Sequence, residues 1–229
     1  MHPTRPPDFF PEWVGRVSPS RRASGVLCPA RHVGLIRKGR ALFVLLSILV
    51  ASTSADEADP MQFVVNLDHE VFSQMGSDAV DETERKRRFA MLIDKYLDLG
   101  AIGKLQLGWR WSKATEEDRT EFSREFRAYL VQAFAARVHA VRDDHMTLIG
   151  VFGSGDAVIV STLVSTRERT GVPVGWRLVK TPGGWRLCDL IVNELSFDSM
   201  FRSQFDSVLE PSQADLKPLN RLLHEKAGG

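Results

Sequence analysis

The hydrophobic period of the chain changes at His145, and this change limits the fold more than any other feature. Before it, apolar residues recur every three or four positions, as in amphipathic helices. After it, apolar and β-branched residues alternate through four runs, at 146–152, 157–166, 174–180 and 184–192. Turn-forming residues separate the runs, so an antiparallel meander is the simplest topology. The pattern predicts an α+β fold with N-terminal helices, a curved four-stranded sheet and C-terminal helices.

Helices are expected on both sides of the sheet region in the sequence. The clearest one begins where Thr115 is followed three residues later by Asp118, a variant of the capping box, and continues with apolar residues four apart. The other expected helices cover about 61–75, the segment from 81 to 97, a short glycine-punctuated stretch at 98–108, and two segments after Asn193.

Residues 37–55 have the pattern of a secretory signal peptide. A basic cluster precedes an uncharged run at 41–51, which is shorter than the roughly 20 apolar residues that span a bilayer. Small residues up to Ala55 predict cleavage after that residue and a periplasmic protein comprising residues 56–229. An uncleaved anchor is the alternative. Residues 1–36 are proline-rich and are expected to be a disordered leader or the result of a start site placed too early, with translation beginning near Val33; a twin-arginine signal at Arg21–Arg22 is a further alternative.

Charge and cysteine content exclude some functions for residues 56–229. The first 55 residues carry eight of the 30 basic and two of the 29 acidic residues, so the remainder has a net charge of −5. Its basic cluster, Arg85–Arg88, is expected to be a solvated helix face, because nucleic-acid binding needs a larger positive surface. Cys28 lies in the leader, which leaves Cys188 without a disulfide partner and suggests a small buried apolar role for it.

Few residues suggest catalysis or metal binding. The histidines after residue 55 lack the i, i+4 spacing of a metal-binding helix, and neither a metal nor another cofactor is expected. One cluster, Asp143, Asp144 and His145, could serve as an acid–base group at the bottom of a cleft. Helix ends and turns also recruit these residue types for capping, and we expect no enzyme. Within a strand, Asp189 is expected to need an ionic partner, with these candidates: Arg177, Arg186 and Arg202.

Two stretches resemble a known family. Residues 98–130 (DLGAIGKLQLGWRWSKATEEDRTEFSREFRAYL) and 175–209 (GWRLVKTPGGWRLCDLIVNELSFDSMFRSQFDSVL) are similar to the MlaC, or toluene-tolerance auxiliary, family. The resemblance implies an NTF2-like or cystatin-like arrangement that encloses an apolar cavity for phospholipid acyl chains. It also implies a role in outer-membrane asymmetry, with lipid carried between an inner-membrane ABC transporter complex and an outer-membrane lipoprotein or porin complex. The alternative is a hopanoid-associated branch of the same family, in which the ligand is a hopanoid.

The side chains expected to line this cavity are apolar residues of the predicted helices and strands. Those of the helices are Phe89, Ile93, Leu97, Ile102, Leu105, Phe126 and Leu130, and those of the strands are Ile149, Val151, Ile159, Leu163, Val174, Trp176 and Leu178. An alternative is a ligand-free adaptor, whose own Phe and Trp side chains would fill the same space.

Overall fold

The first three helices each begin at an aspartate. The computed structural model describes residues 59–76, 80–138, 145–165, 170–210 and 214–228. In it, Asp59, Asp81 and Asp98 accept hydrogen bonds from the free backbone N–H groups of the first turn, at 2.8–3.0 Å. The helices that follow are α1 (Pro60–Met75), α2 (Glu82–Tyr96) and α3 (Leu99–Leu107). All three lie where the sequence predicted helices.

A glycine separates α3 from a short helix that was not predicted from the sequence. Gly108 has a φ of 54° and ends α3, and α4 (Trp109–Lys113) begins directly after it. The long helix α5 (Glu116–Val138) starts as predicted. The amide of Asp118 donates to Thr115 Oγ1 at 3.1 Å, while that hydroxyl donates to the Asp118 carboxylate at 2.7 Å.

The sheet has five strands, and the prediction of four was wrong. The strands are β1 (His145–Ser154), β2 (Ala157–Ser165), β3 (Val172–Thr181), β4 (Gly184–Val192) and β5 (Leu195–Ser196), all antiparallel and in sequence order. Before β5, Asn193 and Glu194 have φ values of 49° and 68°, the backbone of a tight two-residue hairpin turn. Asn193 is a residue type that often adopts this conformation, but glutamate rarely does, and the turn was not predicted.

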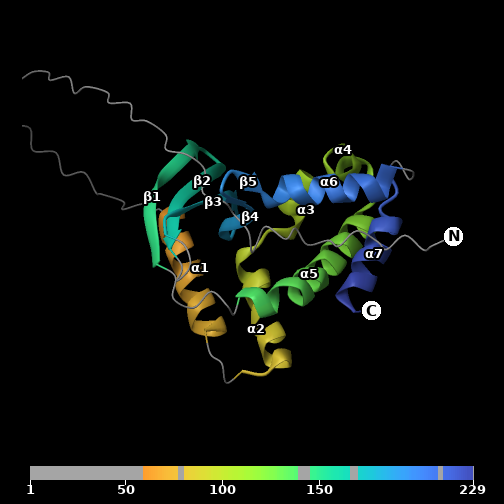
Figure 1. The fold of residues 1–229 in the computed structure, drawn as a ribbon. Helices are drawn as coiled ribbons and strands as arrows, with labels where there is room; N and C mark the ends of the chain where they lie inside the picture. Colours follow the sequence, from red (N-terminus) through yellow and green to blue (C-terminus); the bar gives the residue numbers. More distant parts are fainter. Residues whose placement is uncertain (1–58, 77–79, 139–144, 166–169, 211–213, 229) are drawn as a thin grey trace, which may run out of the picture. The chain divides into compact units, whose positions relative to one another are not determined.

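Two helices close the fold after the sheet. Helix α6 (Phe197–Leu209) is capped by Ser196, and α7 (Lys217–Ala227) packs along α5. Figure 1 shows α1 lying against the curved sheet, and α5, α6 and α7 on the side of the molecule away from β1. The described residues belong to one compact unit.

Two apolar layers form the interior. On the sheet side, Val64 of α1 packs against Val158, Val160 and Leu178, and all four are buried. On the helical side, α5 and α6 join through stacked and perpendicular aromatic rings with centroids 5.2–6.2 Å apart: Phe122, Phe126, Tyr129, Phe201 and Phe205.

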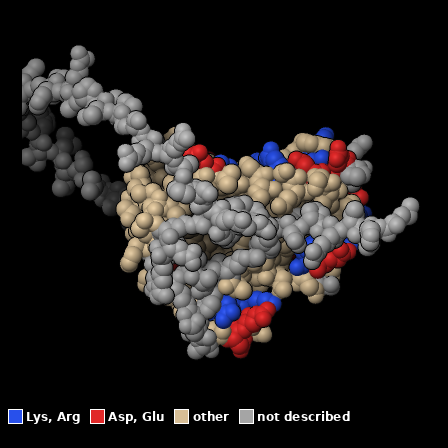
Figure 2. All heavy atoms as spheres, in the orientation of Figure 1, with Lys and Arg blue, Asp and Glu red and all other residues tan. Residues whose placement is uncertain are grey.

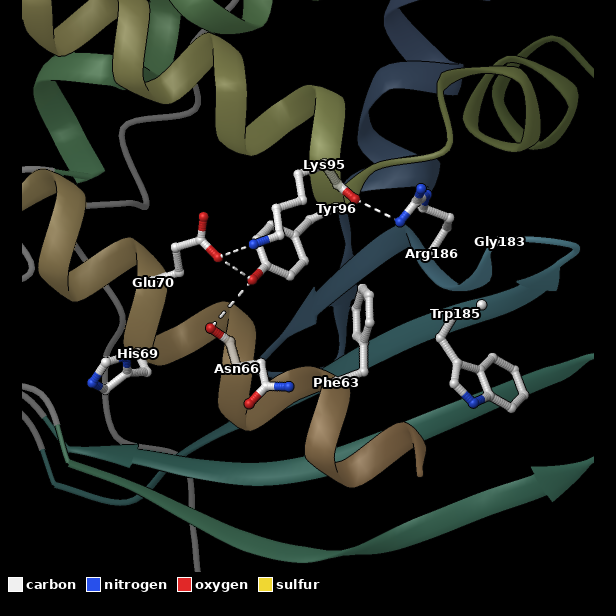
Figure 3. Close-up of a pocket in the computed structure, with 10 residues that line it drawn as sticks. Phe63, Asn66, His69, Glu70, Lys95, Tyr96, Gly183, Trp185 and Arg186 are labelled. Atoms are coloured by element: carbon white, nitrogen blue, oxygen red, sulfur yellow. Dashed lines mark hydrogen bonds and ion pairs between the residues drawn. The ribbon is translucent and has the colours of Figure 1, made fainter. Parts of the chain in front are cut away.

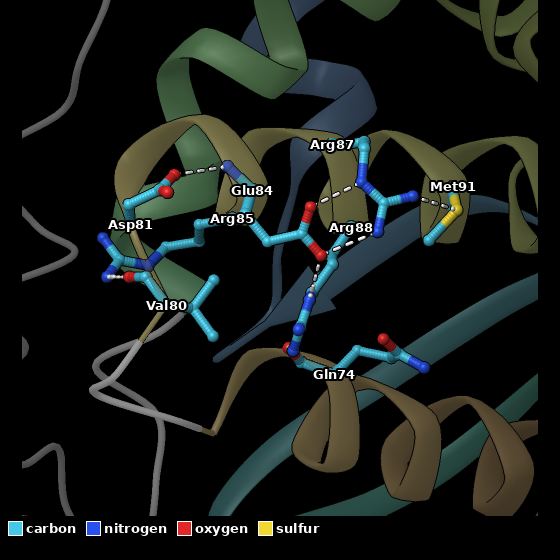
Figure 4. A network of polar contacts seen from close by, with 8 residues as sticks. All are labelled: Gln74, Val80, Asp81, Glu84, Arg85, Arg87, Arg88 and Met91. Carbon is cyan, nitrogen blue, oxygen red and sulfur yellow. Dashed lines mark hydrogen bonds and ion pairs between the residues drawn. The ribbon is translucent and has the colours of Figure 1, made fainter.

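The basic cluster at the start of α2 is the helix face that was predicted. Glu84 accepts hydrogen bonds from Arg87 and Arg88 (Figure 4). On the same helix, Lys86 pairs with Glu82 at 2.6 Å. The two arginines lower the pKa of Glu84 to about 2. Arg88 also donates to the Gln74 carbonyl at 3.1 Å, so this cluster joins the start of α2 to the end of α1.

Charged side chains gather in separate groups on the face shown in Figure 2, with uncharged surface between them. Within the described residues, no helix has both the length and the apolar character that crossing a membrane requires. The predicted leader, signal peptide and cleavage point lie outside the described residues.

Candidate functional site

The sheet has two different faces, and the predicted lining residues are divided between them. Val174, Trp176 and Leu178 of β3 pair with Thr162, Val160 and Val158 of β2 in the register. These residues therefore share the inner face, which packs against α1. Val174 and Leu178 are buried, whereas Trp176 is half-buried and donates from Nε1 to Thr162 Oγ1 at 3.0 Å.

The other four predicted strand residues lie either on the outer face of the sheet or at exposed positions. Ile159 and Leu163 alternate with the inner residues of β2, so they lie on the outer face. Ile149 lies at an irregularity between Leu148 and Gly150 and is 53% exposed. Val151 lies opposite Val160, but β1 is the edge strand, and 37% of Val151 is exposed. The inner face thus carries four of the seven predicted strand residues, of which Val151 lies exposed at the edge of the sheet.

The predicted helix residues fall into a sheet-side group and a helix-side group. Phe89 and Leu97 pack against the buried side chains of Leu67, Leu92 and Tyr96, where α1 meets α2. Ile93, Ile102 and Phe126 are buried, and Phe126 belongs to the aromatic cluster of α5 and α6. Leu105 and Leu130 are half-buried.

Three half-buried residues connect the two groups of apolar contacts on the sheet side. Phe63, Trp176 and Leu187 each pack against both the α1–sheet cluster and the α1–α2 cluster. We call the space around them the bridging layer. Because none of the three is fully buried, apolar side chains of α1 and of strands β3 and β4 remain partly accessible in this layer. The sequence predicted only Trp176 as a lining residue; Phe63 was identified as a helix apolar position, and Leu187 as part of a strand.

A pocket of about 420 Å³ lies beside the bridging layer, between α1, the end of α2 and the β3–β4 hairpin. In Figure 3, Glu70 of α1 faces Tyr96 and Lys95 of α2. Tyr96 donates its hydroxyl to Glu70 Oε2 at 2.5 Å, and Lys95 pairs with the same oxygen. The hydrogen bond from Lys95 holds the pKa of Glu70 below its usual value, while burial raises that of Tyr96.

Arg186 brings strand β4 into contact with the helices that form this pocket. Its guanidinium donates to the Lys95 carbonyl at 2.6 Å and so connects β4 to the end of α2. The sequence analysis had offered Arg186 as a partner of Asp189. Sequence reasoning missed the pocket, because Glu70 and Tyr96 are 26 positions apart and neither has a distinctive local pattern.

Asp189 is buried and pairs with one of the three candidate arginines, as the sequence predicted, although its closest partners are a hydroxyl and a backbone amide. Its carboxylate accepts hydrogen bonds from the Ser196 hydroxyl at 2.7 Å and from the Asp198 amide at 2.9 Å. Of the three candidate arginines, Arg177 lies 3.6 Å away, while Arg202 donates to the Leu105 carbonyl. Asp189 therefore fixes the start of α6 on β4. Beside it, Cys188 is buried, as the sequence indicated, and burial raises its pKa to about 12.

A second pocket of about 440 Å³ lies between α5 and α7. In it, the buried Glu125 lies 3.1 Å from His224 Nδ1 and 2.8 Å from Arg124. This pocket and the first are lined by several polar and charged side chains. An enclosed apolar cavity therefore stays a prediction.

The suggested acid–base cluster does not form a described site. His145 is exposed at the start of β1, and Asp143 and Asp144 lie outside the described residues. The part of the chain that the structure describes contains no group of three or more His, Cys, Asp or Glu side chains that could hold a metal ion.

The fold and the bridging layer define a class of protein in which helices and a curved antiparallel sheet surround accessible apolar side chains. The MlaC protein family matches residues 66–225, most of this chain, and the chain belongs to that family. A solved structure with the same fold is the phospholipid-binding protein from Ralstonia solanacearum in complex with a phospholipid. The two share 20% sequence identity with a TM-score of 0.66, over 75% of this chain and 98% of that one.

Proposed function

We propose that this protein is a periplasmic lipid carrier that holds acyl chains in the bridging layer between α1, α2 and the sheet. It takes a phospholipid, or a related lipid such as a hopanoid, and carries it between an inner-membrane ABC transporter complex and an outer-membrane lipoprotein or porin complex. Export through the signal peptide, with cleavage after Ala55, places it between the two membranes.

The observation that carries this proposal is the incomplete burial of Phe63, Trp176 and Leu187 at the junction of two apolar clusters. Each CH₂ group of an acyl chain that leaves water contributes about 0.8 kcal/mol. A soluble carrier therefore needs apolar side chains that a lipid can reach, and a fully packed core does not offer them. The aromatic cluster of α5 and α6 is such a packed core.

Membership of the MlaC family and the phospholipid in the Ralstonia solanacearum structure support the same assignment. A binding protein without catalysis is also consistent with the position of His145, which lies exposed at the end of an edge strand and outside both pockets. The adaptor alternative requires the bridging layer to be closed by side chains of the protein itself.

Native mass spectrometry of the chain, expressed with its own N-terminus and purified without detergent, tests this function. We expect a stoichiometric lipid adduct, and extraction then identifies the lipid as a phospholipid or a hopanoid. A protein that is free of lipid and also takes none from phospholipid vesicles would contradict the carrier function and favour the adaptor.

A further inference from the structure

The pocket at Glu70, Lys95 and Arg186 is not needed to hold acyl chains, yet it adjoins the bridging layer. Phe63 belongs to both, and Tyr96 and Trp185 each line the pocket while packing into one of the apolar clusters. The aromatic wall of the pocket is thus also the boundary of the apolar layer. A ligand whose tails lie in that layer can place a polar end in the pocket.

The wall is suited to a cationic group. The rings of Phe63 and Tyr96 meet edge to face, with centroids 5.5 Å apart and an angle of 72°. Glu70 lies beside them, and both hydrogen bonds that it receives go to Oε2. Among the described residues, no donor occupies its second oxygen, Oε1. The ammonium of Lys95 already lies 5.1 Å from the centre of the Tyr96 ring, so this wall accommodates a cation. Glu70 Oε1 is the acceptor that a second ammonium group would use.

The opposite end is suited to an anion. Arg186 uses Nη1 for the Lys95 carbonyl, and its other N–H groups have no acceptor among the described residues. The flanking Gly183 and Gly184 have no side chains to block the approach to this guanidinium. In Figure 3, Lys95 lies between Glu70 and Arg186, so the acceptor end and the donor end of the pocket are separated. A guanidinium is the side chain best matched to a phosphate.

We propose that this pocket binds the zwitterionic headgroup of a phosphoethanolamine-type lipid. Arg186 holds the phosphate, and Glu70 Oε1 and the aromatic wall hold the ammonium. This inference rests on the proposed function for the origin of the ligand, but the pocket's chemistry can be tested without acyl chains.

The test is a titration of the full chain with glycerophosphoethanolamine, followed by NMR, alongside glycerophosphoglycerol and inorganic phosphate. We expect glycerophosphoethanolamine to bind about tenfold more tightly than either comparison ligand, since only it offers an ammonium to Glu70. Equal binding of inorganic phosphate would reduce the site to a simple anion site and overturn the proposal.

Two variants assign the ends of the ligand. Glu70→Gln should abolish the preference for glycerophosphoethanolamine, and Arg186→Gln should weaken both glycerophosphodiesters about tenfold. Glu82→Gln is the matched control, because Glu82 also pairs with a lysine but lies outside the pocket. Melting curves of each variant confirm that the fold is retained, and Arg186→Gln tests the phosphate end independently if Glu70→Gln unfolds.

The outcomes separate this proposal from the carrier function. If no headgroup compound binds the pocket while the detergent-free protein still carries stoichiometric lipid, the headgroup site is refuted and the carrier function stands. If glycerophosphoethanolamine binds with the expected preference but no lipid co-purifies or is taken up from vesicles, the pocket is confirmed and acyl-chain carriage fails.

Discussion

The helical side and the sheet side of the molecule bury their apolar residues in different ways. Phe122, Phe126 and Phe205 are at most 1% exposed and contact each other through their ring faces and edges. On the sheet side, Trp176 and Leu187 remain half-buried although they contact two clusters. The first region is a packed core that supports the fold. The second has the accessible apolar surface that a ligand needs, so stability and binding are expected to depend on different residues.

The largest effect is expected from Phe126→Ala on the helical side. Removing a fully buried ring that contacts four aromatic partners should lower the free energy of unfolding by about 3–5 kcal/mol. Urea denaturation measures the loss. The control is Phe152→Ala, which removes a ring that is 59% exposed and should change stability by about 0.5 kcal/mol or less. Similar losses for both variants would mean that the helical side is not the main core.

The tight packing of the helical side is also tested at Gly103. A Cβ at this position would lie 2.4 Å from Cζ3 of Trp111, whose ring packs against Phe122. Gly103→Ala should therefore destabilise the protein by about 1–3 kcal/mol, as measured by thermal unfolding. In the same helix, Gly100→Ala would meet only the end of the Asp98 side chain, at 3.3 Å, and should cost less. Equal losses would show that Trp111 moves aside freely.

Lipid binding on the sheet side is tested by Leu187→Lys, which places a charge in the bridging layer. We expect lipid uptake from vesicles to fall about tenfold, because burying an ammonium among acyl chains is unfavourable. Leu195→Lys is the matched control, since Leu195 is 53% exposed and belongs to neither cluster. Unchanged uptake by Leu187→Lys, with the fold intact, would locate the ligand elsewhere.

The smallest effect on stability is expected from lowering the pH. Hydrogen bonds from Arg87 and Arg88 lower the pKa of Glu84 from 4.5 to about 2. A lowered folded-state pKa stabilises the protein above the unfolded value, and this contribution is lost as the pH falls from 4.5 towards 2. Glu84→Gln should therefore flatten the stability profile slightly over this window, as followed by urea unfolding at each pH. Because Glu84 lies at the junction of α1 and α2, an unchanged profile would mean that this network does not support the sheet side.

Local chemistry made much of the fold predictable. Asp59, Asp81 and Thr115 act as caps within a few residues of the helices that they start, so their role can be read from neighbouring positions. The strand runs were likewise visible as alternation. The fifth strand was missed because it depends on the positive φ of Glu194, which its residue type does not favour.

The site was less predictable, because it depends on register and on pairs that are distant in sequence. Alternation shows that β2 has two faces but does not say which face α1 covers, so Ile159 and Trp176 could not be assigned to different faces. The contact of Phe63 with both clusters, and that of Glu70 with Tyr96, arise only when α1 packs across α2 and the sheet. Long-range packing thus decided which apolar residues remain accessible.

The most direct test is to determine where acyl chains contact the protein. Two variants each keep one tryptophan, Trp176 in the bridging layer or Trp111 in the helical region, with the other tryptophans changed to Phe. Both are loaded with phospholipid that carries bromine on its acyl chains, and tryptophan fluorescence is measured. If acyl chains lie in the bridging layer, we expect strong quenching of Trp176 and little quenching of Trp111. Quenching of Trp111 alone, or equal quenching of both, would contradict it.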